Sequence, residues 1–134
     1  FEKFIDLRAK SNSGKVKLKI SGTANPYNVY YLDELKDFGK KYDVDVDIHL
    51  IQIPEHYDVR ILPDNVKESI IDKFKDRDDL QNVSTHLQST ITNANKHCDD
   101  FVYYTKGLDK IRNLNFGETF SEFHKILKDN NINV

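Results

Sequence analysis

Two carboxylates and an imidazole alternate along one predicted strand: Asp45, Asp47 and His49. Residues two apart in a strand share a face and lie about 6.6 Å from each other. Two of these side chains could share a metal ion, but all three span about 13 Å, too far for one set of ligands at about 2 Å. The favoured interpretation is a half-solvated strand face with its polar residues outward. A metal-dependent hydrolase built on these residues is the least favoured of three hypotheses.

The single cysteine, Cys98, falls within the apolar stripe of a predicted helix. Such a position is typical of a buried structural thiol rather than a nucleophile. His97 is adjacent in sequence but about 100° away around a helix, so the two side chains do not face each other. With one cysteine no internal disulfide can form, which favours a reducing compartment and predicts a cytoplasmic protein.

The ends of two predicted strands are where a ligand site is expected. His56 follows Pro54 at the exit of one strand, and the loop 22–28 follows the other. In parallel α/β proteins, ligands bind at the carboxyl ends of strands, and both loops leave the same end of the sheet. The plainer interpretation is that Pro26 and Pro54 only terminate strands. No phosphate-binding glycine motif and no nucleophile elbow occurs.

The elements that must position these residues alternate in the first half of the chain. A helix, a strand, a helix and a strand predict a parallel βαβ unit, for which Asn28 is the expected helix N-cap. Two strands make a poor independent sheet, so further strands are expected from elsewhere. The expected elements are a helix over 1–9, a strand over 16–20, a helix over 32–42 and a strand over 44–53.

The second half predicts helices only. Apolar spacing indicates a helix over 66–74, a long helix over 83–112 that could break at Gly107, and a last helix from about residue 121. Asn65 with Glu68, and Thr119 with Glu122, are spaced as capping boxes. We therefore divide the chain into a βα portion, 1–63, and a C-terminal helical region, 64–134, within one structural unit.

Charge and composition exclude several classes. The 134 residues carry 20 basic and 22 acidic side chains, a net charge of -2, so no strong nucleic-acid signal exists. No apolar run approaches the roughly 20 residues that span a membrane. The chain contains no methionine and begins at Phe1 inside a predicted helix. We therefore expect a fragment of a longer protein.

Residues 51–63 end a predicted strand in Pro54, followed by the aromatic Tyr57, an aliphatic stretch and Leu62-Pro63 before the helix that contains 66–71. Three further blocks are 28–32 at a helix start and 108–112 and 118–120 near the end of the chain. Together these segments resemble the twitch-type radical S-adenosylmethionine (SAM) proteins. In that family a late barrel strand ends in proline, followed by an aromatic residue, an aliphatic stretch and Leu-Pro before a helix, and the closing segments are similar as well.

The resemblance implies an α/β fold: a partial (β/α)6 barrel whose last two parallel strands and C-terminal helices this chain supplies. In the family, a Cys-x3-Cys-x2-Cys motif holds a [4Fe–4S] cluster, on which S-adenosylmethionine is cleaved to a radical. That motif and the family's glycine-rich segment are absent, so this chain cannot bind the cluster alone. Thr23, Asn25, Gln52 and Pro54 are the residues expected on the wall of the SAM and substrate cavity.

The resemblance leaves the substrate unknown and implies a partner, either the missing N-terminal half of the barrel or another subunit. The alternative hypothesis is a stand-alone, non-catalytic α/β interaction or scaffold domain. A Cys-x3-Cys-x2-Cys motif upstream of Phe1 would distinguish the two.

Overall fold

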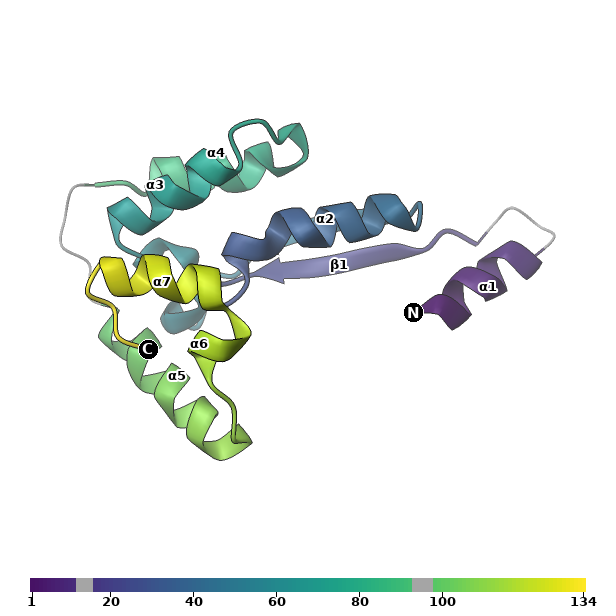
Figure 1. Ribbon diagram of the computed structural model, residues 1–134. Coiled ribbons are helices and arrows are strands. Elements are labelled where there is room, and N and C mark those ends of the chain that lie inside the picture. The colour runs from purple at the N-terminus through teal and green to yellow at the C-terminus, as the bar shows by residue number, and fades with distance from the viewer. Residues whose placement is uncertain (12–15, 93–97) are drawn as a thin grey trace.

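The computed structural model describes residues 1–11, 16–92 and 98–134, and the fold is α/β, mostly helical with two parallel strands (Figure 1). The strands are β1 (Lys19–Ala24) and β2 (Asp45–Leu50). The helices are α1 (Glu2–Lys10), α2 (Leu32–Lys41), α3 (Asp64–Lys73), α4 (Gln81–Ser89), α5 (Asp99–Arg112), α6 (Phe116–Thr119) and α7 (Ser121–Asp129). Single 3-10 turns are η1 (Val29–Tyr31), η2 (Glu55–Tyr57), η3 (Val59–Ile61) and η4 (Asp78–Leu80).

The predicted parallel βαβ unit is confirmed. β1 and β2 pair in parallel with Lys19 opposite Asp45, and α2 connects them. The helix packs closely on the strands because two glycines leave room for it. A Cβ at Gly22 would lie 2.8 Å from Leu35 Cδ2, and one at Gly39 would lie 2.3 Å from Val46 Cγ2.

The first strand lies further along the chain than the alternation predicted. It was expected over 16–20, with a loop from Gly22, but β1 includes Gly22 and continues to Ala24. The reason is pairing: Ala24 lies opposite Leu50, so the ladder with β2 extends through residues whose local pattern favours a loop. The second strand in turn ends at Leu50, before the expected residue 53.

The long helix predicted over 83–112 is interrupted. After α4 ends, the Thr90 hydroxyl donates to the Leu87 carbonyl at 2.8 Å, and the chain stays non-helical through Thr92. Hydrogen bonds from threonine side chains to the preceding turn compete with continued helix. Gly107, the expected break, lies inside α5.

Neither predicted capping box forms. The helix expected to begin at Val66 begins two residues earlier, at Asp64, with Pro63 at the cap position and no side-chain cap. At the second box, Thr119 is the last residue of α6, where its hydroxyl donates to the Asn115 carbonyl at 3.0 Å. Phe120 holds the cap position of α7. These helix starts are set by packing rather than by capping side chains.

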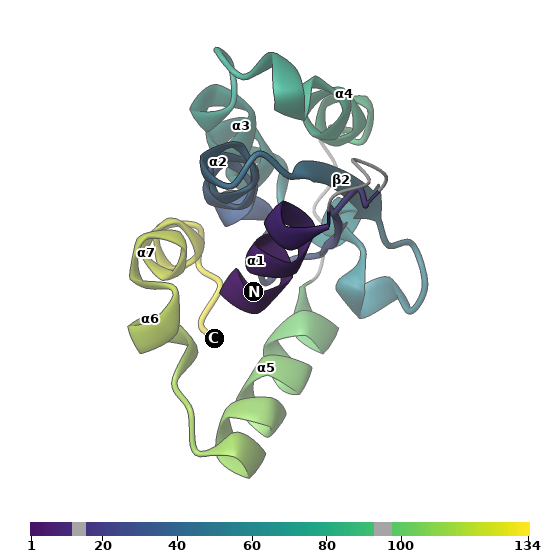
Figure 2. The ribbon, with the colours of Figure 1, turned by 90° about the vertical axis from the view of Figure 1, so that its right-hand side faces the viewer.

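The apolar core lies beyond the carboxyl ends of the strands, which point into the helical part of the molecule (Figure 1). Figure 2 shows α3 and α4 on one side of this part and α5, α6 and α7 on the other. Its fully buried side chains include Val59, Leu62, Val66, Ile70, Phe74, Leu80, Val83, Leu87, Phe101, Phe123 and Leu127.

Helix α1 forms as predicted and lies near the opposite end of the sheet. The Phe1 ring contacts Phe38 at a centroid distance of 4.9 Å, and Arg8 donates to the carbonyls of Tyr42 and Asp43 at 3.0 and 2.6 Å. None of the residues of α1 is buried. Among the described residues no helix is both long and apolar enough to cross a membrane.

Candidate functional site

The polar side chains of β2 belong to a solvated sheet face, as the favoured interpretation predicted. Asp47 is ion-paired with Lys19 of β1. Hydrogen bonding between the two raises the pKa of Lys19 and lowers that of Asp47. In the part of the chain that the structure describes, no three His, Cys, Asp or Glu side chains are grouped so that they could hold a metal ion.

Cys98 is a buried thiol, as predicted. It stands at the N-cap of α5, and its Sγ donates to the Ile61 carbonyl at 3.2 Å. Burial raises the pKa of the thiol to about 11, so it stays protonated at neutral pH. Its neighbour His97 lies outside the described residues. The cysteine holds α5 against η3 and offers no thiolate.

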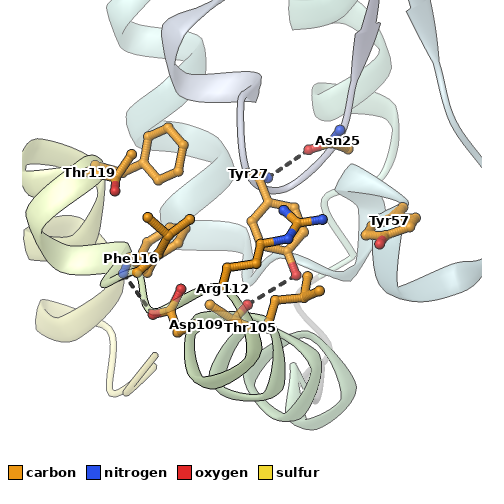
Figure 3. A pocket seen from close by; sticks show the side chains of 11 residues that line it. Asn25, Tyr27, Tyr57, Thr105, Asp109, Arg112, Phe116 and Thr119 are labelled. Carbon is orange, nitrogen blue, oxygen red and sulfur yellow. Dashed lines mark hydrogen bonds between the residues drawn. The ribbon is translucent and has the colours of Figure 1, made fainter.

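A pocket of about 350 Å³ lies at the carboxyl ends of the strands (Figure 3). We call it the aromatic pocket. Its volume lies within the range of small-molecule sites. It is lined by Asn25, Tyr27, Tyr57, Thr105, Leu108, Asp109, Arg112, Leu114, Phe116, Thr119 and Phe120.

The loop after β1 positions Tyr27 through two asparagines. Asn25 Oδ1 accepts from the Tyr27 amide, and Asn28 Oδ1 accepts from the Asn25 amide, both at 2.9 Å. Asn28 Nδ2 also donates to the Thr23 carbonyl at 2.8 Å. Asn28 therefore ties the loop together and makes no side-chain cap on η1, in contrast to its predicted role. Turns held by asparagine side chains give the loop a defined shape.

Aromatic rings form the walls. Tyr27 packs edge-on against Tyr57 and Phe116 at centroid distances of 6.0 and 6.2 Å, and Phe116 contacts Phe120 at 5.1 Å. The hydroxyls of Tyr27 and Thr105 are 3.2 Å apart and hydrogen-bonded. Burial raises the pKa of Tyr27, which keeps the phenol neutral. These contacts hold the rings around a preformed apolar space.

Two charged residues of α5 complete the pocket. Asp109 Oδ2 accepts from the Phe116 amide at 2.7 Å, which fixes the start of α6 (Figure 3). Arg112 lies one turn further along and has no hydrogen bond or ion pair to any described residue. It is not ion-paired even with Asp109. Its guanidinium is therefore available to a ligand.

Of the four residues predicted on the cavity wall, only one lines the aromatic pocket. Asn25 lines the aromatic pocket. Thr23 is exposed on β1 opposite His49, while Gln52 and Pro54 are exposed after β2 and do not line the pocket. His56 also lies outside the lining, stacked on Tyr104 at 4.0 Å.

The pocket residues on α5 and α6 have no motif of their own. In the sequence Thr105 and Asp109 are ordinary positions of a predicted helix, and Phe116 lies between the last two predicted helices. The available signal was the block 108–112, where Asp109 and Arg112 are three residues apart and so share one helix face.

No protein-family model, no curated protein and no solved structure matches this chain.

Proposed function

We propose that the chain is the C-terminal portion of a cytoplasmic radical SAM-like enzyme. In this proposal β1 and β2 are the last two strands of a partial (β/α)6 barrel. The aromatic pocket forms part of the wall of the cavity that holds S-adenosylmethionine and a substrate.

The observation that carries the proposal is where the family-like blocks lie. Tyr57 belongs to the block 51–63, Arg112 to the block 108–112 and Phe120 to the block 118–120. These blocks are separated by tens of residues, yet each lines the aromatic pocket. A ligand site common to a family is lined by segments that are typical of that family. In parallel α/β proteins such a site lies at the carboxyl ends of the strands, where this pocket lies.

The sheet also supports a larger assembly. Parallel sheets are normally covered on both faces, but here α2 covers one face while Lys19 and His49 lie exposed on the other. Along the outer edge of β2, Lys36 Nζ donates to the Val46 carbonyl at 2.6 Å. The outer edge of β1 faces no other described strand. A further strand would pair with the outer edge of β1. In the resulting barrel α2 would lie outside, and the sheet face that carries Lys19 and His49 would face the interior.

The residues of this chain do not fit the iron–sulfur cluster. Cys98 is the only cysteine in the sequence, and its thiol is buried and protonated. The cluster ligands would come from upstream residues. The residues of this chain would instead bind and orient a ligand: the rings of Tyr27 and Phe120 exclude water, and Arg112 offers a positive charge.

The test is the intact mass and the iron and sulfide content of the native gene product, purified without oxygen. We expect a mass well above 15.7 kDa and stoichiometric iron and sulfide. We also expect 5′-deoxyadenosine when the protein is reduced with S-adenosylmethionine. A larger product without iron would contradict the proposal.

The second candidate is a non-catalytic α/β interaction domain. It is favoured by α1, where Phe4 and Leu7 are 61% and 63% exposed. Apolar side chains exposed on one helix are typical of a surface that another protein covers. A native mass near 15.7 kDa without iron would support this candidate instead.

A further inference from the structure

We infer that the aromatic pocket binds a planar ring compound that carries a carboxylate, with the ring between the aromatic walls and the carboxylate on Arg112. The inference rests on the proposed function in that both assign a ligand to this pocket. It adds the chemical class of that ligand.

The walls select a flat apolar group. The ring of Phe116 packs against the rings of Tyr27 and Phe120. Leu108 and Leu114 add aliphatic surface to the lining. Rings stack on or meet aromatic walls edge-on with little loss of side-chain freedom, because the walls are already ordered. About 350 Å³ accommodates a fused two-ring system with a short side chain.

The charge selects the substituent. The chain has four arginines, all within the described residues, and three of them bind protein groups. Arg8 donates to main-chain carbonyls, Arg60 pairs with Asp58, and Arg77 pairs with Asp79. Among the described residues Arg112 has no hydrogen-bond or ion-pair partner, and of the four arginines only Arg112 lines the aromatic pocket.

A guanidinium matches a carboxylate because its planar fork donates two parallel hydrogen bonds. Asp109, one turn earlier, is engaged by the Phe116 amide through Oδ2. Arg112 is the cationic side chain of the lining, so we assign the carboxylate to its guanidinium and the ring to the apolar walls.

The experiment is calorimetric titration of the native gene product with indole-3-propionate and with its neutral amide, indole-3-propionamide. We expect the acid to bind about tenfold or more tightly than the amide, the usual scale of a charge-assisted hydrogen bond. Arg112→Gln should remove that difference. Lys110→Gln, an exposed cation on the same helix outside the pocket, should preserve it.

Equal binding of acid and amide, no binding of the acid, or an equal loss in Lys110→Gln would overturn the inference. Arg112→Lys provides a second variant in case Arg112→Gln unfolds: it keeps the charge but loses the fork, so we expect intermediate affinity. The titration needs neither iron nor S-adenosylmethionine. If the protein binds indole-3-propionate but contains no iron, only the proposed function is contradicted. If the protein contains iron but does not bind indole-3-propionate, only this inference is contradicted.

Discussion

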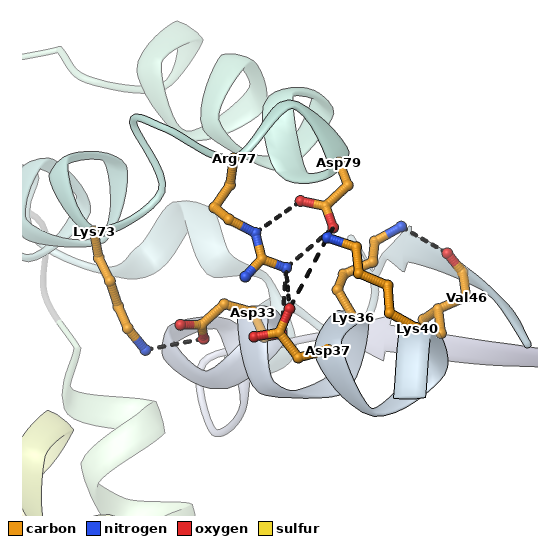
Figure 4. Close-up of polar contacts among 8 residues, drawn as sticks. All are labelled: Asp33, Lys36, Asp37, Lys40, Val46, Lys73, Arg77 and Asp79. Carbon is orange, nitrogen blue, oxygen red and sulfur yellow. Dashed lines mark hydrogen bonds and ion pairs between the residues drawn. The ribbon is translucent and has the colours of Figure 1, made fainter. Parts of the chain in front are cut away.

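Two arginines of this molecule lie in opposite kinds of surroundings. Arg77 lies in a network of ion pairs between α2 and η4 (Figure 4), whereas Arg112 lies at the aromatic pocket and has no hydrogen-bond or ion-pair partner in the described part of the chain. Both are on the surface of a small α/β fold. The comparison separates charges that hold the fold together from a charge that the fold leaves available.

Each charged group in the network around Arg77 has a partner of opposite charge. Arg77 Nη2 lies 2.8 Å from Asp37 and its Nε lies 2.9 Å from Asp79, which also pairs with Lys40 at 2.9 Å. Nearby, Lys73 pairs with Asp33 at 2.9 Å. The hydrogen bond from Arg77 holds the pKa of Asp79 well below its usual range, with Lys40 adding to the effect. These pairs join α2 to the last residue of α3 and to the segment that follows it.

The aromatic pocket is open by contrast. Its rings pack on one another, and Asp109 accepts a hydrogen bond from the Phe116 amide. Arg112 makes no hydrogen bond or ion pair with the described residues. An arginine held by carboxylates from two elements contributes to folding. In the proposed binding mode Arg112, beside a preformed apolar space, contributes to binding instead, because its guanidinium stays hydrated until a ligand arrives.

The largest expected effect concerns the wall that both folding and binding use. Phe116 is 3% exposed and packs against Phe120, so Phe116→Ala should cost about 3–5 kcal/mol of unfolding free energy. Leu114 also lines the pocket but is 58% exposed, so Leu114→Ala should cost far less. Urea unfolding of the two variants measures the difference. Equal losses would mean that the pocket wall is not packed as described.

The arginines themselves give the next effect. Arg77→Gln should lower the unfolding free energy by about 1–2 kcal/mol, because it leaves Asp37 and Asp79 without their main partner. Arg112→Gln should change it by less than about 0.5 kcal/mol. Thermal unfolding at low ionic strength measures both. A larger loss for Arg112→Gln would show that its charge stabilises the fold and is not reserved for a ligand.

The network should also make stability depend on pH. A carboxyl group whose pKa is lower in the folded state contributes stability above its unfolded value, near 3.8 for Asp79, and loses it as pH falls toward the folded value. We expect the unfolding free energy to decline below about pH 4, with about 1 kcal/mol of that decline removed in Asp79→Asn. Asp129→Asn, at the exposed end of α7, is the matched control. An unchanged slope in Asp79→Asn would contradict the network.

The smallest effect compares two helical glycines. A Cβ at Gly107, on α5, would have nothing within 4 Å, so Gly107→Ala should raise stability by about 0.5–1 kcal/mol. A Cβ at Gly39, on α2, would lie 2.7 Å from the Val44 carbonyl, so Gly39→Ala should lower stability. Melting temperatures of the two variants should therefore move in opposite directions. A gain for Gly39→Ala would mean that α2 packs less closely on β2.

The sequence predicted the parallel βαβ unit because alternation and helical spacing are local signals. It missed the extent of β1, since the strand character of Thr23 comes from pairing with His49 across the sheet. It also missed the break after α4, which depends on a threonine side chain bonding to the preceding turn. Long-range pairing and single side-chain hydrogen bonds leave little trace in apolar periodicity.

The expected site region contains a pocket, but only one of the four predicted residues lines it. The rule that ligands bind at the carboxyl ends of parallel strands pointed to this region, and Asn25 lines the pocket there. Arg112 and Phe116 reach the same pocket from helices that follow much later. Their approach depends on how α5 and α6 fold back onto the loop at Tyr27, which is a property of tertiary packing.

The most direct test of the account is to locate a bound carboxylate by NMR. In a titration of the isotope-labelled native gene product with indole-3-propionate, the amide signals of Phe116, Thr119 and Arg112 should shift together and saturate. Arg112→Gln should weaken the response while leaving the same residues affected. Shifts at exposed apolar residues such as Phe4 and Ile53, with none around the aromatic pocket, would contradict the claim that Arg112 and the rings form a ligand site.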